Sequence, residues 1–175
     1  MTALTVRAAR ADDVAAMTTI YNDVVASSTA IYASQPSTLA ERLDWFNQRT
    51  AGGFPVLAAV HDDELVGYAS FAEFRGAWPG YLHSVEHSVY VRADRWRRGV
   101  GSTLVRSLLP LAAAMDKHVM IGGIDAANDG SLRLHERLGF QRVAHFREVG
   151  RKFGRWLDLV FVQRYLDAPG APRAG

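Results

Sequence analysis

The spacing of hydrophobic residues in the first part of the chain predicts a strand followed by two helices. Leu4–Ala9 favours a short strand, and apolar residues then recur every three or four positions, which predicts a helix capped by Asp12 or Asp13 and ending near Ser27. The buried positions of this helix are expected to be Val14, Met17, Tyr21, Val24 and Val25. A second helix is expected from about Ser37 or Thr38 to Gly52-Gly53, with Leu39, Leu43 and Phe46 on its apolar face.

The middle of the chain predicts three strands and the longest helix. Two β-branched, apolar runs flank the turn Asp62-Asp63, a pattern typical of paired strands. The expected strands are Pro55–His61, Glu64–Phe74 and Ser84–Val91, with a loop at Arg75–His83 between the last two. A helix over Gly101–Met115 follows, and Pro110 is expected to bend it. Its apolar face comprises Leu104, Leu108, Leu111 and Met115.

The last part of the chain predicts a buried strand, a short helix and two long strands. These are His118–Ile124, Gly130–Leu138, Phe140–Gly150 and Arg155–Leu166. The complete order of elements is βααβββαβαββ, which predicts an α/β (α+β) protein with a central, mixed and mostly antiparallel sheet of about seven strands. A chain of 175 residues is expected to form one domain, here residues 1–167. Residues 168–175 are rich in proline, glycine and alanine and are expected to be a disordered tail.

Composition and charge limit the classes of function. The formal net charge is only +2 and the sequence pI is about 9.1, which gives a weak electrostatic footprint for nucleic acid. The chain has no cysteine, which excludes disulfides, thiolate metal sites and cysteine nucleophiles. The first residues lack the apolar core of a signal peptide, and no apolar run approaches the roughly 20 residues that span a bilayer. We therefore expect a cytoplasmic protein that does not bind a membrane.

The stretch RWRRGVGSTL, residues 95–104, allows two interpretations. A strand, a glycine turn and the start of a helix together bind phosphate, because the first N–H groups of a helix lack internal partners and glycines let a pyrophosphate approach the backbone. Alternatively, Trp96 among three arginines could stack on the bases of a nucleic acid. No second basic cluster supports the nucleic-acid interpretation, although a G-x-G pattern alone is also compatible with an ordinary turn.

Four blocks of sequence in order resemble the GNAT superfamily of N-acetyltransferases over about Val6 to Leu166. They are IYND (20–23), VEHSVYV (85–91), RLHERLGF (133–140) and KFGRWLD (152–158). Within the superfamily the chain is most similar to the phosphinothricin acetyltransferase and methionine sulfoximine/sulfone acetyltransferase group. The resemblance implies a GNAT-type fold, acetyl-CoA as co-substrate, a small amino-acid-like amine as acceptor, direct acetyl transfer and a homodimer.

The resemblance also implies which residues bind acetyl-CoA. Backbone groups of the strand would pair with the cofactor like an added strand, the glycine turn would hold the pyrophosphate, and one asparagine would hold the pantetheine arm or cap its helix. The expected cofactor residues are Val89, Tyr90, Val91, Arg97, Arg98, Gly99, Val100, Gly101, Ser102 and Asn128, with Arg95 at the rim. The sequence departs from the family at Trp96, where Gln or Arg is usual three residues before the first glycine.

Two residues are candidates for proton transfer. Period-2 alternation places Glu86, Ser88 and Tyr90 on one face of their strand and His87 on the other. A carboxylate in a sheet has a raised pKa when buried, which suits a base, although a solvent-facing Glu86 is equally compatible with the pattern. The resemblance assigns Glu86 as the base. His135 stands where many GNAT enzymes have a tyrosine that protonates the thiolate, and it could pair with Glu86, relay a proton, or simply face solvent near the helix end.

The acceptor site is expected to lie between the aromatic loop and the strand Ser84–Val91. The expected substrate residues are Arg75, Gly76, Ala77, Glu86, His87 and Ser88, with Phe74, Trp78 and Tyr81 as possible walls. Leu82 occupies a position where the family often has an arginine, so the identity of the amine stays open. A peptide N-terminus or an aminoglycoside is the alternative acceptor. No metal site is expected, because the six histidines are scattered and no carboxylate set completes a cluster.

Overall fold

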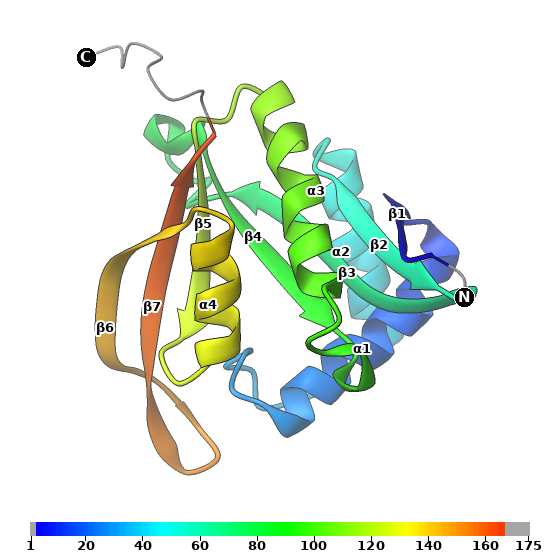
Figure 1. Ribbon diagram of the computed structural model, residues 1–175, viewed down its shortest axis with the longest axis horizontal. Helices are drawn as coiled ribbons and strands as arrows, with labels where there is room; N and C mark the ends of the chain where they lie inside the picture. Colours follow the sequence, from blue (N-terminus) through cyan, green and yellow to red (C-terminus); the bar gives the residue numbers. More distant parts are fainter. Residues whose placement is uncertain (1–2, 167–175) are drawn as a thin grey trace.

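A twisted seven-stranded sheet organises the computed structural model, which describes residues 3–166 (Figure 1). The strands are β1 Thr5–Ala8, β2 Val56–His61, β3 Glu64–Glu73, β4 Ser84–Val91, β5 Val119–Asp125, β6 Gln141–Lys152 and β7 Arg155–Tyr165. Their order in the sheet is β1-β2-β3-β4-β5-β7-β6. Every pair is antiparallel except β4–β5, so the predicted mixed, mostly antiparallel sheet is confirmed. The expected tail, residues 168–175, lies outside the described residues.

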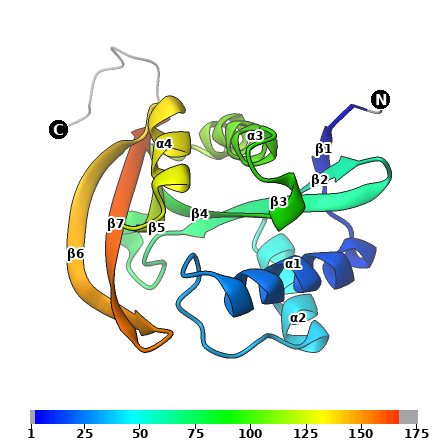
Figure 2. The same ribbon diagram turned by 60° about the horizontal axis from the view of Figure 1, so that its bottom comes forward.

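Helices cover both faces of the sheet. They are α1 Val14–Ser27, α2 Leu39–Ala51, α3 Val100–Ala114 and α4 Asp129–Arg137. Figure 2 shows α1 and α2 on one face and α3 and α4 on the other. The core under α3 contains Leu104 and Leu108, whereas the smaller core under α1 and α2 contains Met17 and Tyr68. Among residues 3–166, no helix has both the length and the apolar character needed to cross a membrane.

A capping residue explains where α2 begins, but the start of α1 has no side-chain cap. Thr38 caps α2, since its hydroxyl accepts a hydrogen bond from Glu41 N at 3.2 Å and the Glu41 carboxylate accepts one from Thr38 N at 2.8 Å. The cap expected for α1 is different: Asp13 makes no side-chain bond to that helix. Its carboxylate accepts two bonds from the Arg7 guanidinium, at 2.7 and 2.8 Å, and so fixes β1 to the start of α1.

Two of the apolar positions predicted to be buried are instead exposed. Leu39 is 46% exposed and Leu111 is 38% exposed. Leu39 is the first residue of α2, and on α3 the small side chain of Ala112 is buried while Leu111 is not. The helical period therefore gave the correct element and most of the buried face in both cases, since Leu104 and Leu108 of α3 and Phe46 of α2 are buried as predicted.

The parallel pair β4–β5 separates part of the way along. The two strands are in register only where Ser84–Glu86 faces Val119–Ile121. Beyond this point β4 continues to pair with β3, and β5 continues to pair with β7 as far as Asp125. The strands open like a V in Figure 1. One edge of β4 from His87 to Val91 is therefore free of a neighbouring strand, and the candidate site lies there.

Candidate active site

A groove of about 1000 Å³ runs from the free edge of β4 between α3 and α4. Its lining combines the end of β4, the turn before α3 and the first half of α4, which brings together segments far apart in the sequence. Nine of the ten expected cofactor residues are in this lining, namely Val89, Tyr90, Val91, Arg97, Gly99, Val100, Gly101, Ser102 and Asn128. The tenth, Arg98, is described by the structure but is not part of the lining.

The turn before α3 presents backbone donors to this groove. Gly99 has φ +84°, in the left-handed region that favours glycine, and it places α3 immediately after the turn. The first intrahelical bond is donated by Thr103 N to Gly99 O, so the N–H groups of residues 100–102 precede it and are free to bind a ligand. With the positive end of the helix dipole, they form a site for a phosphate or diphosphate.

The Trp96 side chain closes the groove beside β4. Its indole N–H donates to Val91 O at 2.8 Å, although the ring itself is half exposed. This bond shows that the Val91 carbonyl points away from β3, and by the period of two the polar backbone groups of Val89 point the same way. Trp96, the residue at which the sequence departs from the family, therefore holds the free edge of β4. The backbone N–H and C=O of Val89 lie on this edge and are available to a ligand.

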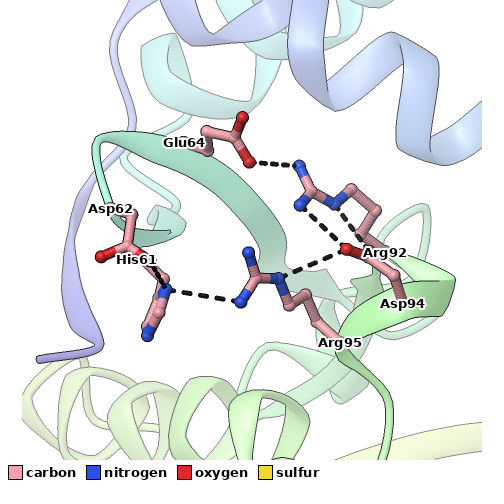
Figure 3. A network of polar contacts seen from close by, with 6 residues as sticks. All are labelled: His61, Asp62, Glu64, Arg92, Asp94 and Arg95. Carbon is pink, nitrogen blue, oxygen red and sulfur yellow. Dashed lines mark hydrogen bonds and ion pairs between the residues drawn. The ribbon is translucent and has the colours of Figure 1, made fainter. Parts of the chain in front are cut away.

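A network of charged residues holds the segment that leads into the turn (Figure 3). Arg92 bridges Asp94 at 2.7 Å and Glu64 at 3.0 Å, which ties this segment to the start of β3. Arg95 lies 3.4 Å from Asp94 and 3.5 Å from His61. The guanidinium of Arg95 is therefore held in the network, and Arg95 also lines the groove, at the rim of which it was expected.

A smaller chamber of about 200 Å³ lies where β4 and β5 separate. Glu86 lines it, and the Glu86 carboxylate lies beside Gly123 of β5, where an added Cβ would be 3.4 Å from Oε1. The surrounding protein removes part of the water around the carboxylate and so raises the pKa of Glu86. A partly desolvated carboxylate that still reaches an open chamber is suited to accept a proton.

His87 and His135 form a buried pair at the inner wall of this chamber. Their Nε2 atoms lie 2.9 Å apart, and His87 Nδ1 lies 2.8 Å from Ile121 O. The pairing of His135 with Glu86, one of the expected alternatives, is wrong, because β4 alternation places His87 and not Glu86 on the face that α4 covers. A solvent-facing His135 is also wrong, since this residue is only 2% exposed.

The close packing of this pair depends on a glycine and an aromatic ring. A Cβ on Gly122 would lie 2.6 Å from His87 Cε1, so the imidazole fits against β5 only because residue 122 has no side chain. Phe140 covers both imidazoles, with ring centroids 5.4 Å from His87 and 5.2 Å from His135. The geometry of the two histidines is thus fixed by three different elements.

We expect the burial of His87 to make the protein less stable in acid. Burial, together with the charge of His135, lowers the pKa of His87 to about 3, while the unfolded value is about 6.5. Below pH 6.5 the unfolded chain therefore binds more protons, and the free energy of unfolding falls by up to about 1.4 kcal/mol per pH unit for each such proton. Urea unfolding at pH 7.5, 6 and 5 measures this slope. The slope should become smaller in His87→Asn and stay unchanged in His83→Asn, a change at an exposed histidine before β4; equal slopes in all three proteins would contradict this expectation.

Asn128 has both of the roles considered for it from the sequence. Its side-chain oxygen accepts a bond from Ser131 N at 3.1 Å, so it caps α4. It also lines the groove and the chamber, as does Ser131. These two residues therefore stand at the junction where a ligand in the groove would meet the chamber.

The loop between α1 and α2 closes the chamber and is held by the β6–β7 hairpin. Lys152 donates to Ser28 O at 2.8 Å and Ile31 O at 2.7 Å, and the Tyr32 hydroxyl donates to Asp158 O at 2.9 Å. Ala30 lies between these anchors and lines both cavities. The block KFGRWLD, which supplies Lys152 and Asp158, thus shapes the site through this loop.

Some expected residues do not come together with the rest, and others were missed. Glu86, His87 and Ser88 line the chamber, but within residues 3–166 the lining of neither cavity includes Arg75, Gly76 or Ala77. The sequence analysis did not identify three arginines that line the groove, Arg106, Arg133 and Arg137. Two of them are four residues apart on one helix, a spacing that places both on one face and could have signalled a second anionic subsite.

Comparison with known proteins agrees with this geometry. The model of the Acetyltransferase (GNAT) family matches residues 17–140. The chain is 43% identical to the L-amino acid N-acyltransferase MnaT of Escherichia coli (strain K12) and 42% identical to an L-methionine sulfoximine/L-methionine sulfone acetyltransferase of Salmonella typhimurium, in each case over 98% of this chain and 99% of the relative. It also superposes with a TM-score of 0.93 on a phosphinothricin acetyltransferase (Pat) from Sinorhizobium meliloti solved with AcCoA, at 33% identity over 100% of this chain and 94% of that one.

Proposed function

Because the chain belongs to the GNAT family of acetyltransferases, we propose that it transfers the acetyl group of acetyl-CoA to the amino group of a small amino-acid-like substrate. The observation that carries this proposal is the free edge of β4, which connects a phosphate-binding turn to a small chamber that contains a carboxylate. The volume of the chamber, about 200 Å³, favours a substrate the size of an amino acid over an aminoglycoside or a peptide. Methionine sulfone, methionine sulfoximine and phosphinothricin are the candidate acceptors.

The residues have distinct roles in the proposed reaction. The N–H groups at residues 100–102 hold the pyrophosphate, Val89 pairs with the pantetheine arm, and Arg106, Arg133 and Arg137 face the remaining phosphate of the cofactor. Bound acetyl-CoA supplies an activated thioester. Glu86 accepts the proton that the amine must lose, directly or through a water molecule, and His135 supplies a proton to the leaving thiolate.

Turnover with a panel of amines tests the proposal. The protein is mixed with acetyl-CoA and each of the three candidate acceptors, a peptide and an aminoglycoside, and the free thiol is followed. We expect thiol release with at least one small amino-acid-like amine. Thiol release only with the peptide or the aminoglycoside would show that the acceptor belongs to that class and is not amino-acid-like. No turnover with any amine, together with no acetyl-CoA binding by calorimetry, would reject the proposal. A steep salt dependence of DNA or RNA affinity would instead support the nucleic-acid interpretation.

We also propose that the enzyme is a homodimer formed through the β6–β7 hairpin. This hairpin lies at one edge of the sheet and carries five large apolar side chains that are 45% to 60% exposed. They are Val143, Phe146, Val149, Phe153 and Trp156. Such a concentration of exposed apolar surface is typical of an interface between chains. Because the same hairpin anchors the loop around Ala30, a dimer would also stabilise the wall of the chamber.

The variant Trp156→Glu tests the dimer. Placing a charge at a 60% exposed tryptophan of the proposed interface should weaken association by at least about 2 kcal/mol, or roughly 30-fold in the dissociation constant. Size-exclusion chromatography with light scattering measures the change from dimer to monomer. Leu39→Glu, at a 46% exposed leucine on α2, is the matched control and should remain dimeric. A wild-type protein that is monomeric at micromolar concentration would contradict the proposal.

A further inference from the structure

Three close polar contacts connect the two buried histidines into one chain. His87 Nδ1 lies 2.8 Å from Ile121 O, the two Nε2 atoms lie 2.9 Å apart, and His135 Nδ1 lies 2.7 Å from Ser131 O. A carbonyl oxygen only accepts hydrogen bonds, so each Nδ1 must carry a proton to make its contact. This series of contacts therefore begins and ends at carbonyl oxygens, which accept hydrogen bonds. Its middle contact joins the Nε2 atoms of the two histidines.

Counting protons shows that two neutral rings cannot make all three contacts. Two neutral imidazoles carry two N–H groups in total, and both are used by Ile121 O and Ser131 O. The Nε2 lone pairs would then face each other at 2.9 Å without a proton between them. One additional proton completes the chain, with His87 Nε2 as acceptor and His135 Nε2 as donor. All three contacts are therefore hydrogen bonds only in a pair that carries one positive charge.

The surroundings of the pair exclude a second charge, and burial lowers the pKa of His135 as well, so the hydrogen bonds of the pair must hold the one additional proton. The described residues that line the chamber include the carboxylates of Glu86 on β4 and Asp125 on β5 but no lysine or arginine. On the remaining sides the pair contacts the uncharged Ser131 of α4 and the ring of Phe140. Burial and the charge of His135 together lower the pKa of His87 to about 3, so a second added proton does not bind near neutral pH.

Ser131 provides a partner for the pair after the extra proton has left. The Ser131 hydroxyl lies 3.4 Å from His135 Nδ1, which also contacts the Ser131 carbonyl. Ser131 lines both the groove and the chamber. If Nδ1 loses its proton, the hydroxyl can donate to it, while His135 Nε2–H still donates to His87. Each of the four ring nitrogens then has a partner in a neutral pair, although the hydrogen bond to Ser131 O is lost. The two charge states of the pair therefore differ in the partner of His135 Nδ1.

We propose that His87 is a positioning residue that makes His135 hold one shared proton, and that the Ser131 hydroxyl passes a proton from this pair to the leaving thiolate. This role rests on the proposed acetyl transfer. The amine nitrogen forms a bond to the thioester carbonyl carbon, the C–S bond breaks, and sulfur keeps the electron pair. The Ser131 O–H proton moves to sulfur and the His135 Nδ1 proton replaces it, which leaves the pair neutral. Glu86 takes the proton from nitrogen, and the pair regains its proton from water.

The variant His87→Asn tests the role of this residue in catalysis. Asparagine keeps a donor for Ile121 O but removes the acceptor for His135 Nε2, so kcat should fall about 10-fold or more while acetyl-CoA affinity stays the same. In the wild type the protonated pair is the active form, so kcat falls as the pH rises above the pKa of the pair. This fall of kcat at high pH should shift or disappear in His87→Asn.

Two further variants complete the test. His83→Asn, at an exposed histidine before β4, should leave kcat and its pH dependence unchanged. Ser131→Ala should lower kcat, although its backbone N–H still donates to the Asn128 cap.

The ¹⁵N chemical shifts of the histidine side chains test the shared proton directly in the wild-type protein. We expect both Nδ1 atoms to be protonated and the two Nε2 atoms to titrate in a single step. Separate titration of the two rings at ordinary pKa values, or an unchanged pH profile in a folded His87→Asn, would overturn the proposal. The turnover and acetyl-CoA binding of the wild type decide the proposed function independently, because the spectrum needs neither ligand.

Discussion

Replacing Glu86 by glutamine should lower kcat by about 10²- to 10⁴-fold, the range that general acid–base catalysis contributes. Glutamine has nearly the same shape and keeps the position beside Gly123, but its amide cannot accept the proton of the amine. Because the pyrophosphate turn and the edge of β4 are unaffected, the dissociation constant for acetyl-CoA should stay within about 2-fold of the wild type. Steady-state kinetics with a small amino-acid-like acceptor and calorimetry with acetyl-CoA measure the two quantities.

The pH dependence adds a second readout for the same residue. Glu86 must be unprotonated to act as a base, so kcat/KM should rise as the pH rises through the pKa of this carboxyl. Because partial burial raises this pKa, the limb should lie above the usual value for glutamate of about 4.3, and it should be absent in Glu86→Gln.

The matched control is Glu136→Gln on α4, which neutralises an exposed carboxylate that pairs with Arg142 at 2.8 Å. A surface pair of this kind contributes little, so kcat should not change. An equal kcat for Glu86→Gln and the wild type, or a loss of acetyl-CoA binding together with kcat, would remove Glu86 from the role of base.

The sequence predicted the strands and helices because their hydrophobic period is local information. The strand Ser84–Val91 has the predicted bounds, and α1 ends at the predicted Ser27. The same pattern misplaced Leu39 and Leu111, since the period shows that one face is apolar but not which neighbouring element covers it. The ion pair between Arg7 and Asp13 could not be predicted either, because Arg7 comes from a strand and not from the helix that Asp13 precedes.

The site was predictable where a short motif carries its own geometry. The turn at residues 97–102 brings a left-handed glycine and a helix start together within a few residues, and the structure contains this predicted geometry. The histidine pair was not identified, since its members are 48 positions apart and meet only because α4 crosses the place where β4 and β5 separate. The alternation of β4 did place His87 on the opposite face from Glu86, but it does not show which residue of another element contacts His87 on that face. Arg106 on α3 and the arginines of α4 were also missed, although the four-residue spacing of Arg133 and Arg137 is visible in the sequence.

Replacing Gly101 by valine should weaken acetyl-CoA binding by about 100-fold, which corresponds to about 2.7 kcal/mol. Gly101 lines the groove in the first turn of α3, where backbone N–H groups are expected to hold the pyrophosphate. A Cβ at this position would lie 3.2 Å from Leu134 Cδ1 and 3.6 Å from Val91 Cγ2. The two γ-methyl groups of valine would therefore occupy the groove, which separates the diphosphate from its donors.

This substitution separates binding of the cofactor from chemistry. Glu86 and the histidine pair lie beyond the turn, so kcat at saturating acetyl-CoA should fall much less than kcat/KM does. Thr103→Val is the matched control, because it places the same side chain in the same turn of α3 at an exposed position outside both linings. Valine itself costs less than about 1 kcal/mol of helix propensity, so melting without ligand should be similar in the two variants. Calorimetry then compares their acetyl-CoA affinities, and equal values for Gly101→Val and Thr103→Val would show that the diphosphate is held somewhere other than this turn.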